Sequence, residues 1–294
     1  MIQYFSHSQI DTAKWDACID KSYNAEVYAY SWFLNSVSPG WNAVVMDDYE
    51  VVMPIPEKKM YGVSYVVQPP YCQKLGIFSP EPLPVQIRKK FTRFLKRYVS
   101  VRFFSNIPLR TWNKHIEEPN FELDISQSCD DIYSQFNKNT CRNIKKAYSV
   151  IHEVVSVSVD DVIQFYNYNV PHSLPQSYWR VLEHLLRVFY SKNILQCLAV
   201  YSGNSIIAVA VFIISKHKAY YFLAASNAEG KEKRAMFAII DSFIRSYSQS
   251  ISVLDFEGSN VSGVANFYKG FGAKLVPYYK FEYHKIPFLG KFIT

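Results

Sequence analysis

The hydrophobic and polar positions in the first part of the chain predict short helices alternating with strands. Apolar residues recur every three or four positions in the segments that we interpret as helices, whereas β-branched and aromatic residues dominate the segments that we interpret as strands. Pro84 precedes a basic amphipathic helix whose outer face we interpret as solvated surface rather than a nucleic-acid stripe. The expected helices are 11–19, 28–37 and 86–99, and the expected strands are 41–46, 51–54, 63–68 and 99–105.

The second part of the chain repeats this order of elements. The tripeptide Ser202-Gly203-Asn204 predicts a tight hairpin turn between two of its strands. The expected helices are 130–148, 160–168, 176–190, 232–247 and 263–271, and the expected strands are 150–155, 195–201, 205–215, 218–225, 252–256 and 274–283.

Two pairs of segments match between the parts at nearly the same spacing. VSVRFFSN (99–106) falls on ISVLDFEG (251–258) at an offset of 152, and DDYEVVMPI (47–55) falls on YSGNSIIAV (201–209) at an offset of 154. A fixed internal period indicates two copies of one α/β unit. We therefore expect two similar domains, 1–122 and 123–294, with a cleft between them.

Composition and charge narrow the class of protein. The chain has 294 residues, of which 49% are hydrophobic and 19% charged, so it can bury a large core; disorder, collagen and coiled coil are excluded. The net charge is +7, and most of the excess lies after residue 125. A positive field suits an anionic partner such as a nucleotide, a phosphate-bearing substrate or an RNA end, and the alternative is an ordinary solvated basic face.

The apolar runs indicate where the protein is located, and the cysteine spacing indicates whether it forms disulfides or binds a metal. The N-terminal residues lack the basic and apolar regions of a signal peptide, and every apolar run is shorter than the ~20 residues that span a bilayer. We therefore expect a cytoplasmic protein without membrane insertion. The cysteines show no CxxC or His-Cys ligand spacing, so neither a disulfide framework nor a metal site is predicted. They are Cys18, Cys72, Cys129, Cys141 and Cys197.

Three strings carry a resemblance to a known family. FNKNTCRNIKKA (136–147), LDFEGS (254–259) and VANFYKGFGAKLVPYYKF (264–281) resemble the signature of the Fem-type peptidoglycan aminoacyltransferases and their FemAB-like relatives, and the order of elements in each part resembles the GNAT acyltransferase fold. The resemblance implies an α/β protein of two tandem GNAT-like (acyl-CoA N-acyltransferase-like) domains. It implies acyl transfer from an aminoacyl-tRNA or an acyl-CoA to a small-molecule amine or a nucleotide-linked acceptor related to the cell wall. We expect tRNA as a partner and no binding to DNA.

The catalytic candidates lie near the end of the chain. Lys269 matches the lysine of the Fem tail motif, and a cation there offsets oxyanion charge or holds a phosphate; the alternative is a surface lysine whose neighbours, Tyr268 among them, face the core. Asp255 and Glu257 stand two apart on a predicted strand, so their side chains share a face. A carboxylate at the end of such a strand accepts the proton of an amine, and Glu257 is the better placed. The alternative is that these acids cap the turn that follows.

The substrate-binding candidates are basic and aromatic. Arg142 and Lys145 or Lys146 share one helix face and suit a diphosphate or an RNA phosphate, and the alternative is that these late cations stabilise the helix dipole. Gln68 and Tyr71 flank a stiff Pro-Pro entry to a loop that resembles the corresponding FemAB-like loop, and the alternative is a plain connector.

The donor site is less well defined. Gly230 and Lys231 are what remains of the GNAT pyrophosphate loop, and they are the candidate contacts to a donor such as acyl-CoA. The helical arm that some Fem enzymes insert is absent. The half-lost loop motivates an alternative function, a non-catalytic ligand-binding protein with a degenerate GNAT fold. A sequence-independent RNA binder is a third hypothesis.

Overall fold

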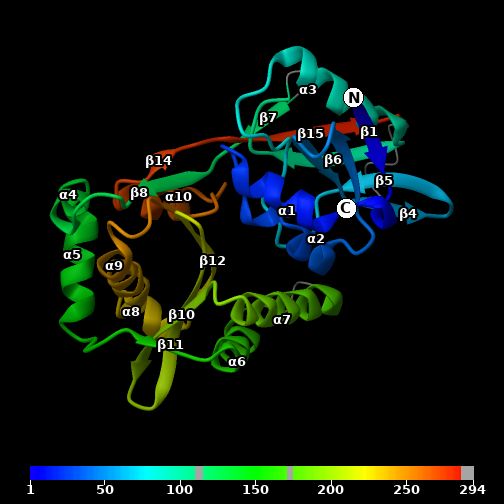
Figure 1. Ribbon diagram of the computed structural model, residues 1–294. Helices are drawn as coiled ribbons and strands as arrows, with labels where there is room; N and C mark the ends of the chain where they lie inside the picture. The colour runs from blue at the N-terminus through cyan, green and yellow to red at the C-terminus, as the bar shows by residue number, and fades with distance from the viewer. Residues whose placement is uncertain (110–114, 171–174, 286–294) are drawn as a thin grey trace. The chain divides into compact units, whose positions relative to one another are not determined.

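The chain divides by its internal contacts into two units, which Figure 1 shows coloured along the sequence. The computed structural model describes residues 1–109, 115–170 and 175–285. Unit 1 comprises Met1–Glu118 and Pro277–Thr294, and unit 2 comprises Pro119–Val276. The sequence-based ranges had placed residues 277–294 with the second part, whereas the contacts place them in unit 1.

Unit 1 begins with a small antiparallel sheet of β1 (Ile2–Phe5), β2 (Asn42–Met46) and β3 (Val51–Ile55), in that spatial order. Its helices α1 (Thr12–Lys21) and α2 (Ser31–Val37) lie between β1 and β2 in the chain, and Val27–Ala29 form a 3-10 turn before α2. Asp11 begins α1, because its carboxylate accepts from the N–H groups of Ala13 and Lys14. The indoles of Trp15 and Trp41 pack edge to face, 4.6 Å apart, in the core beneath this sheet.

A second sheet in unit 1 contains five strands in the order β4-β5-β6-β15-β7. β5 and β6 are parallel, and the helix α3 with its 3-10 extension η3 joins them. The last strand of the chain, β15, is antiparallel to both β6 and β7. The bounds are β4 (Glu57–Met60), β5 (Val63–Val67), α3 (Val85–Thr92), η3 (Arg93–Arg97), β6 (Ser100–Ser105), β7 (His115–Glu118) and β15 (Tyr278–His284).

Unit 2 is built on a seven-stranded sheet in the order β14-β8-β13-β12-β11-β10-β9. The pair β12 and β13 is parallel, and the other neighbours are antiparallel. The bounds are β8 (Phe121–Asp124), β9 (Val155–Ser156), β10 (Leu195–Ser202), β11 (Ser205–Ser215), β12 (Lys218–Ser226), β13 (Val253–Asp255) and β14 (Lys274–Leu275).

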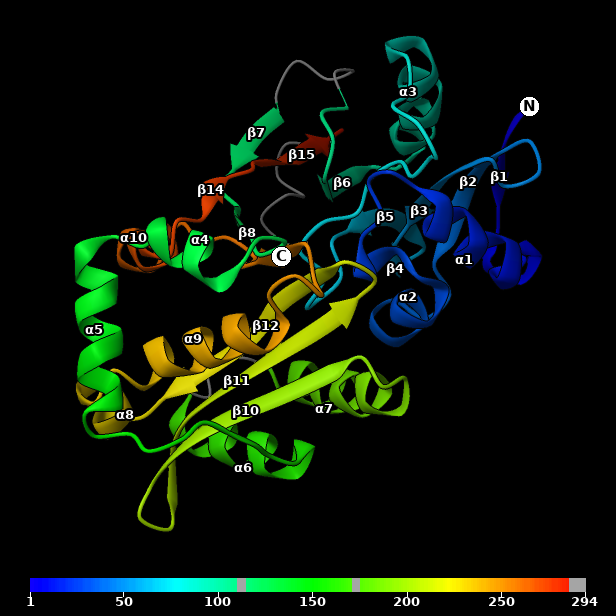
Figure 2. The ribbon, with the colours of Figure 1, turned by 60° about the vertical axis from the view of Figure 1, so that its left-hand side comes forward.

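Helices cover both faces of this sheet, as Figure 2 shows for α9 on one face and α6 on the other. The apolar run of β11, buried from Ile207 to Ile213, requires cover on both sides. On the α9 side the rings of Phe212 and Phe243 stack 3.9 Å apart. The helices are α4 (Cys129–Ser134), α5 (Lys138–Tyr148), α6 (Val159–Asn169), α7 (Gln176–Ser191), α8 (Ala228–Glu232), α9 (Ala235–Tyr247) and α10 (Ser262–Gly270).

The two units share an order of elements. Each has an antiparallel hairpin, β2–β3 or β10–β11, followed by a parallel pair whose strands are joined through a helix, β5-α3-β6 or β12-α9-β13. The segments that match in sequence fall on the hairpin turns and on β6 and β13. The correspondence is partial, because β2 and β3 belong to a different sheet from β5 and β6, whereas β10 to β13 share one sheet.

Two predicted elements are divided in the structure. The helix expected at 130–148 is two helices, because Asn137 starts α5 as its N-cap, with its side chain accepting from the N–H of Thr140. The strand expected at 274–283 is β14 and β15, which belong to different sheets. Pro277 lies between them and has no N–H to continue a ladder.

None of the helices in the described ranges combines the length and the apolarity that crossing a bilayer requires.

Candidate active site

The sheet of unit 2 opens between two of its central strands. β12 and β13 pair in parallel from Lys218 opposite Val253 to Tyr220 opposite Asp255. β12 then continues to Ser226 as the partner of β11, whereas β13 ends at Asp255. The two strands therefore part beyond Tyr220 and Asp255, within a sheet that is otherwise continuous.

A β-bulge lies on β12 directly after this split. Val211 on β11 faces Leu223, and Phe212 faces Tyr221, so Phe222 is the extra residue. A bulge interrupts the regular ladder and changes the direction of nearby groups, and bulges are over-represented beside active sites. The split and the bulge together mark this part of the sheet as the candidate active site.

Asp255 lies at the split and is fully buried. Its Oδ2 is 2.8 Å from the ammonium nitrogen of Lys218, which also donates to Glu122 Oε1 at 2.7 Å. Its Oδ1 accepts from the backbone N–H of Glu257 at 2.9 Å. A buried carboxylate that is both ion-paired and hydrogen-bonded is suited to holding a turn in place. Lys218 is not among the candidates that the sequence offers. The one feature that could have identified it is its position as a cation at the start of a buried strand.

Glu257 follows in a tight turn. Its φ is 58°, and that of Gly258 is 72°, so two successive residues adopt the left-handed region. Only glycine fits the second position, because a Cβ on Gly258 would overlap the carbonyl oxygen of Pro119. The turn confirms neither role for Glu257; it leaves the residue half-buried, directly after the split.

Tyr268 on α10 lies near these groups. Its ring is buried and stacks on Phe256 at 4.6 Å and 18° between planes. Burial raises the pKa of the Tyr268 hydroxyl, and the carboxylates of Glu257 and Asp255 raise it further. The phenol therefore stays protonated near neutral pH. Sequence analysis had placed Tyr268 only among the core residues beside Lys269.

Lys269, the first catalytic candidate, follows Tyr268 on α10 and is exposed. Its ammonium nitrogen lies 5.5 Å from the centre of the Phe121 ring. An exposed ammonium over an aromatic face gains modest stabilisation and remains hydrated. The structure thus places Lys269 one residue from Tyr268 but on the solvent side of the helix.

The basic cluster of α5 is exposed as a whole. Arg142, Lys145 and Lys146 face solvent, while Ile144 and Ala147 on the same helix are buried. Arg142 donates from Nη2 to Oδ1 of Asn139 at 2.8 Å, which holds its guanidinium close to the helix. The three cations share the outer side of α5, so the arrangement is compatible with a phosphate contact and with dipole stabilisation alike.

Gly230 and Lys231 lie on α8, the short helix that follows β12. The N–H of Gly230 donates to Oδ1 of Asn227 at 2.8 Å, and a Cβ at Gly230 would overlap the carbonyl oxygen of Ile207. Glycine is therefore required where this helix packs on β11. Lys231 is exposed.

Gln68 and Tyr71 belong to unit 1. Gln68 donates from its amide to the carbonyl oxygen of Cys72 at 2.9 Å and accepts from the N–H of Phe104 at 3.1 Å, so it ties the loop to β6. Tyr71 is half-buried with a φ of 57°. Lys74, two residues beyond Cys72, forms a buried ion pair with Glu26 at 3.6 Å, and sequence analysis did not identify this pair.

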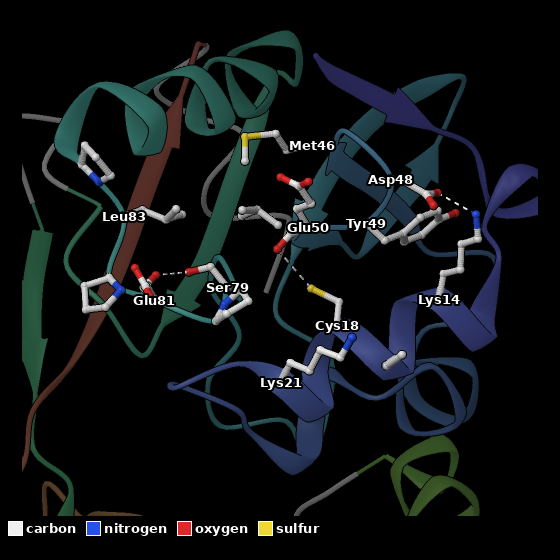
Figure 3. Close-up of a pocket in the computed structure, with 15 residues that line it drawn as sticks. Lys14, Cys18, Lys21, Met46, Asp48, Tyr49, Glu50, Ser79, Glu81 and Leu83 are labelled. Carbon is white, nitrogen blue, oxygen red and sulfur yellow. Dashed lines mark hydrogen bonds and ion pairs between the residues drawn. The ribbon is translucent and has the colours of Figure 1, made fainter.

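A pocket of about 620 Å³ also lies in unit 1, with its lining drawn in Figure 3. Its side chains come from α1, from the turn between β2 and β3, and from the Pro-rich segment 79–84. Lys14 pairs with Asp48 at 2.6 Å across the rim, and the buried Cys18 lies deeper. The lining mixes both signs of charge, with Lys14 and Lys21 against Asp48, Glu50 and Glu81, so it does not favour a ligand of one charge.

No group of three or more His, Cys, Asp or Glu residues that suits a metal ion occurs within residues 1–109, 115–170 and 175–285. No family model and no curated protein matches the sequence. Solved structures do match its fold. FemX superposes with a TM-score of 0.68 at 11% identity, covering 99% of this chain and 100% of FemX.

The chain has a FemAB-like GNAT fold.

Two further structures support this assignment of the fold. The C-terminal domain of a putative lysylphosphatidylglycerol synthetase from Agrobacterium fabrum has a TM-score of 0.58 at 9% identity, covering 92% of this chain and 90% of that domain. A GNAT-family acetyltransferase from Colwellia psychrerythraea has a TM-score of 0.57 at 9% identity, covering 96% and 99%. The resemblance drawn from the sequence motifs is therefore confirmed at the level of the FemAB-like GNAT fold.

Proposed function

We propose that this protein is an N-acyltransferase that moves an acyl or aminoacyl group from an activated donor to an amine. One observation carries the proposal: the parallel strands β12 and β13 part beside a β-bulge, and the buried Tyr268 hydroxyl lies close enough to Glu257 for that carboxylate to affect its pKa. The likeness of the fold to FemX and to GNAT acetyltransferases supports it.

The reaction uses these groups as follows. The donor carbonyl lies at the split, and the lone pair of the acceptor nitrogen attacks its carbon, forming the new C–N bond while the carbonyl electrons move to oxygen. Glu257 accepts the proton that the nitrogen loses. When the intermediate collapses, the bond to the leaving sulfur or oxygen breaks, and the protonated Tyr268 hydroxyl donates to that atom. Asp255 and Lys218 act as positioning residues for the turn that carries Glu257.

We propose an aminoacyl-tRNA or an acyl-CoA as the donor and a small-molecule or nucleotide-linked amine as the acceptor, in a reaction related to cell-wall synthesis. Both donors are cytoplasmic molecules, and we propose that location for the reaction. Lys269 and the α5 cations Arg142, Lys145 and Lys146 stay proposed contacts to phosphates of either substrate, since they are exposed cations in unit 2. Gly230 and Lys231 stay proposed donor contacts, and Gln68 and Tyr71 proposed acceptor contacts.

The test is a transfer assay. Purified protein is incubated with a pool of aminoacyl-tRNAs and, separately, a panel of acyl-CoA thioesters, each with a mixture of primary amines, and products are detected by mass spectrometry. We expect new amides with one class of donor. Absence of amide products with both classes would refute the proposed function.

Variants then test the roles of the residues. We expect Tyr268→Phe and Glu257→Gln each to lower kcat about 100-fold, the usual effect of removing one acid–base group. The matched control is Tyr247→Phe, because Tyr247 lies on α9 and its hydroxyl donates to Gln196 instead. Full activity in Tyr268→Phe would refute its role while leaving the transferase activity established.

A further inference from the structure

The segment formed by α3 and η3 in unit 1 is strongly basic. Between Pro84 and Tyr98 it carries six cations and no acidic residue. Its apolar side chains are turned inward: Phe91 and Leu95 are buried. The cations are Arg88, Lys89, Lys90, Arg93, Lys96 and Arg97.

Three of these cations line a hollow of about 460 Å³. Lys90, Arg93 and Arg97 supply the charge, and the half-buried Phe94 supplies an aromatic surface. The acid of the lining, Asp47, forms an ion pair with the amino group of Met1. The hollow therefore keeps a net positive charge, and its volume lies in the usual range of small-ligand sites.

Arg97 lies over aromatic rings at this hollow. Its guanidinium carbon lies 4.6 Å from the centre of the Phe94 ring and 5.9 Å from that of Tyr4. Arg97 is nevertheless exposed, and among the described residues no carboxylate lies within ion-pair distance of Arg97, Arg93 or Lys90. A guanidinium that stacks on a ring keeps its N–H groups and its outer face available, so it suits an anionic, planar partner.

Two kinds of anionic macromolecular surface could match this charge, a membrane and a nucleic acid. A helix that lies on a membrane needs exposed large apolar side chains on a free face. The apolar side chains of this segment are instead buried or half-buried against unit 1. A concave basic surface with an aromatic ring and an available guanidinium plane is typical of sites that bind single strands.

We propose that this hollow binds the phosphate backbone of a single-stranded nucleic acid, with Lys90, Arg93 and Arg97 on phosphates and a base stacked on the outer face of the Arg97 guanidinium, which lies over the Phe94 ring. The site lies in unit 1, and its binding does not depend on the proposed transfer reaction. If the donor of that reaction is an aminoacyl-tRNA, the unpaired end of the same RNA is a ligand of this kind.

The experiment measures fluorescence anisotropy of a labelled 12-nucleotide oligouridylate RNA titrated with the full-length protein at several salt concentrations. Three phosphate contacts predict a slope of about −2 in a plot of log K against log salt, at ~0.7 per phosphate of a single strand. We expect Arg93→Ala/Arg97→Ala to weaken binding about 10- to 100-fold and to reduce the slope to about −0.7.

The matched control is Lys89→Ala/Lys96→Ala, which removes the same charge from the same segment but from residues outside the hollow. We expect it to change affinity less than about 3-fold, since such exposed charges act only at a distance and are screened by salt. Equal losses in the two double variants, or no RNA binding by wild-type protein, would overturn the proposal. Sedimentation with vesicles containing 30% anionic lipid is the second arm, and binding to vesicles but not to RNA would likewise overturn it.

Discussion

Replacing Gly258 by alanine should destabilise unit 2 through the turn that carries Glu257. The φ of Gly258 is 72°, and a Cβ there would overlap the carbonyl oxygen of Pro119 and lie 3.1 Å from Cα of Asn120. The left-handed conformation costs an alanine about 1–2 kcal/mol, and overpacking against rigid backbone costs about 1–3 kcal/mol. We therefore expect the free energy of unfolding to fall by about 2–5 kcal/mol.

The same substitution at Gly263 provides the control. Gly263 lies in the first turn of α10, it has ordinary helical backbone, and no atom lies within 4 Å of a Cβ built on it. Gly263→Ala should stabilise the protein by about 0.5 kcal/mol, because alanine loses less conformational freedom on folding. Urea unfolding followed by circular dichroism measures both variants. A Gly258→Ala protein within about 0.5 kcal/mol of wild type would refute the account of this turn, since the principal costs would then be absent.

Other predictions follow from buried groups. Lys218→Met should lower the free energy of unfolding by about 3 kcal/mol in urea titrations, because Asp255 is left buried with its ion-pair partner removed; a neutral result would show that the pair is dispensable. Asp241→Ala should cost about 2 kcal/mol, since this buried carboxylate accepts hydrogen bonds from two side chains of unit 2, and a thermal shift below about 1 °C would contradict this. Burial raises the pKa of the Cys18 thiol to about 11 and that of Cys197 to about 12. Both thiols should resist alkylation by iodoacetamide at pH 8, and rapid alkylation of either, read by mass spectrometry, would contradict this. Their contribution to the free energy of unfolding should be complete below pH ~9 and should fall as the pH rises toward these values, because the thiols of the unfolded chain ionise first.

The long elements were predictable from the sequence because their periodicity is strong. The 16-residue α7 and the continuous apolar run of β11 fall where the pattern placed them. The strands that the pattern missed are short or polar, such as β4, whose sequence is EKKM, and β8, a four-residue strand with alternating burial. A strand of this kind is fixed by its partners in the sheet rather than by its own residues.

The candidate active site was predictable only in part, for a related reason. Spacing brought Asp255 and Glu257 together, but it placed both on a strand, whereas the strand ends at Asp255 and Glu257 lies in a left-handed turn. Tyr268 was indistinguishable from the other aromatic residues of α10, because its role depends on which carboxylates lie near its hydroxyl. Lys218 and Asp255 are 37 residues apart in sequence, and their contact depends on the register of a parallel pair that no local pattern fixes.

The folding of unit 1 depends on a strand that follows the whole of unit 2 in the sequence. β15 lies between β6 and β7 in the five-stranded sheet, and the whole of unit 2 separates it from them in the sequence. Until residues 278–284 are available, β6 lacks one neighbour and β7 lacks the strand it pairs with, leaving unpaired edges that promote association between chains. Closing a loop of about 160 residues is also slow, since the entropy of closure must be overcome before the strand pairs form. Unit 2 is thus an insertion within unit 1, and its folded state shortens the effective loop that β15 must close. Unit 1 therefore completes its five-stranded sheet only when β15 pairs with β6 and β7.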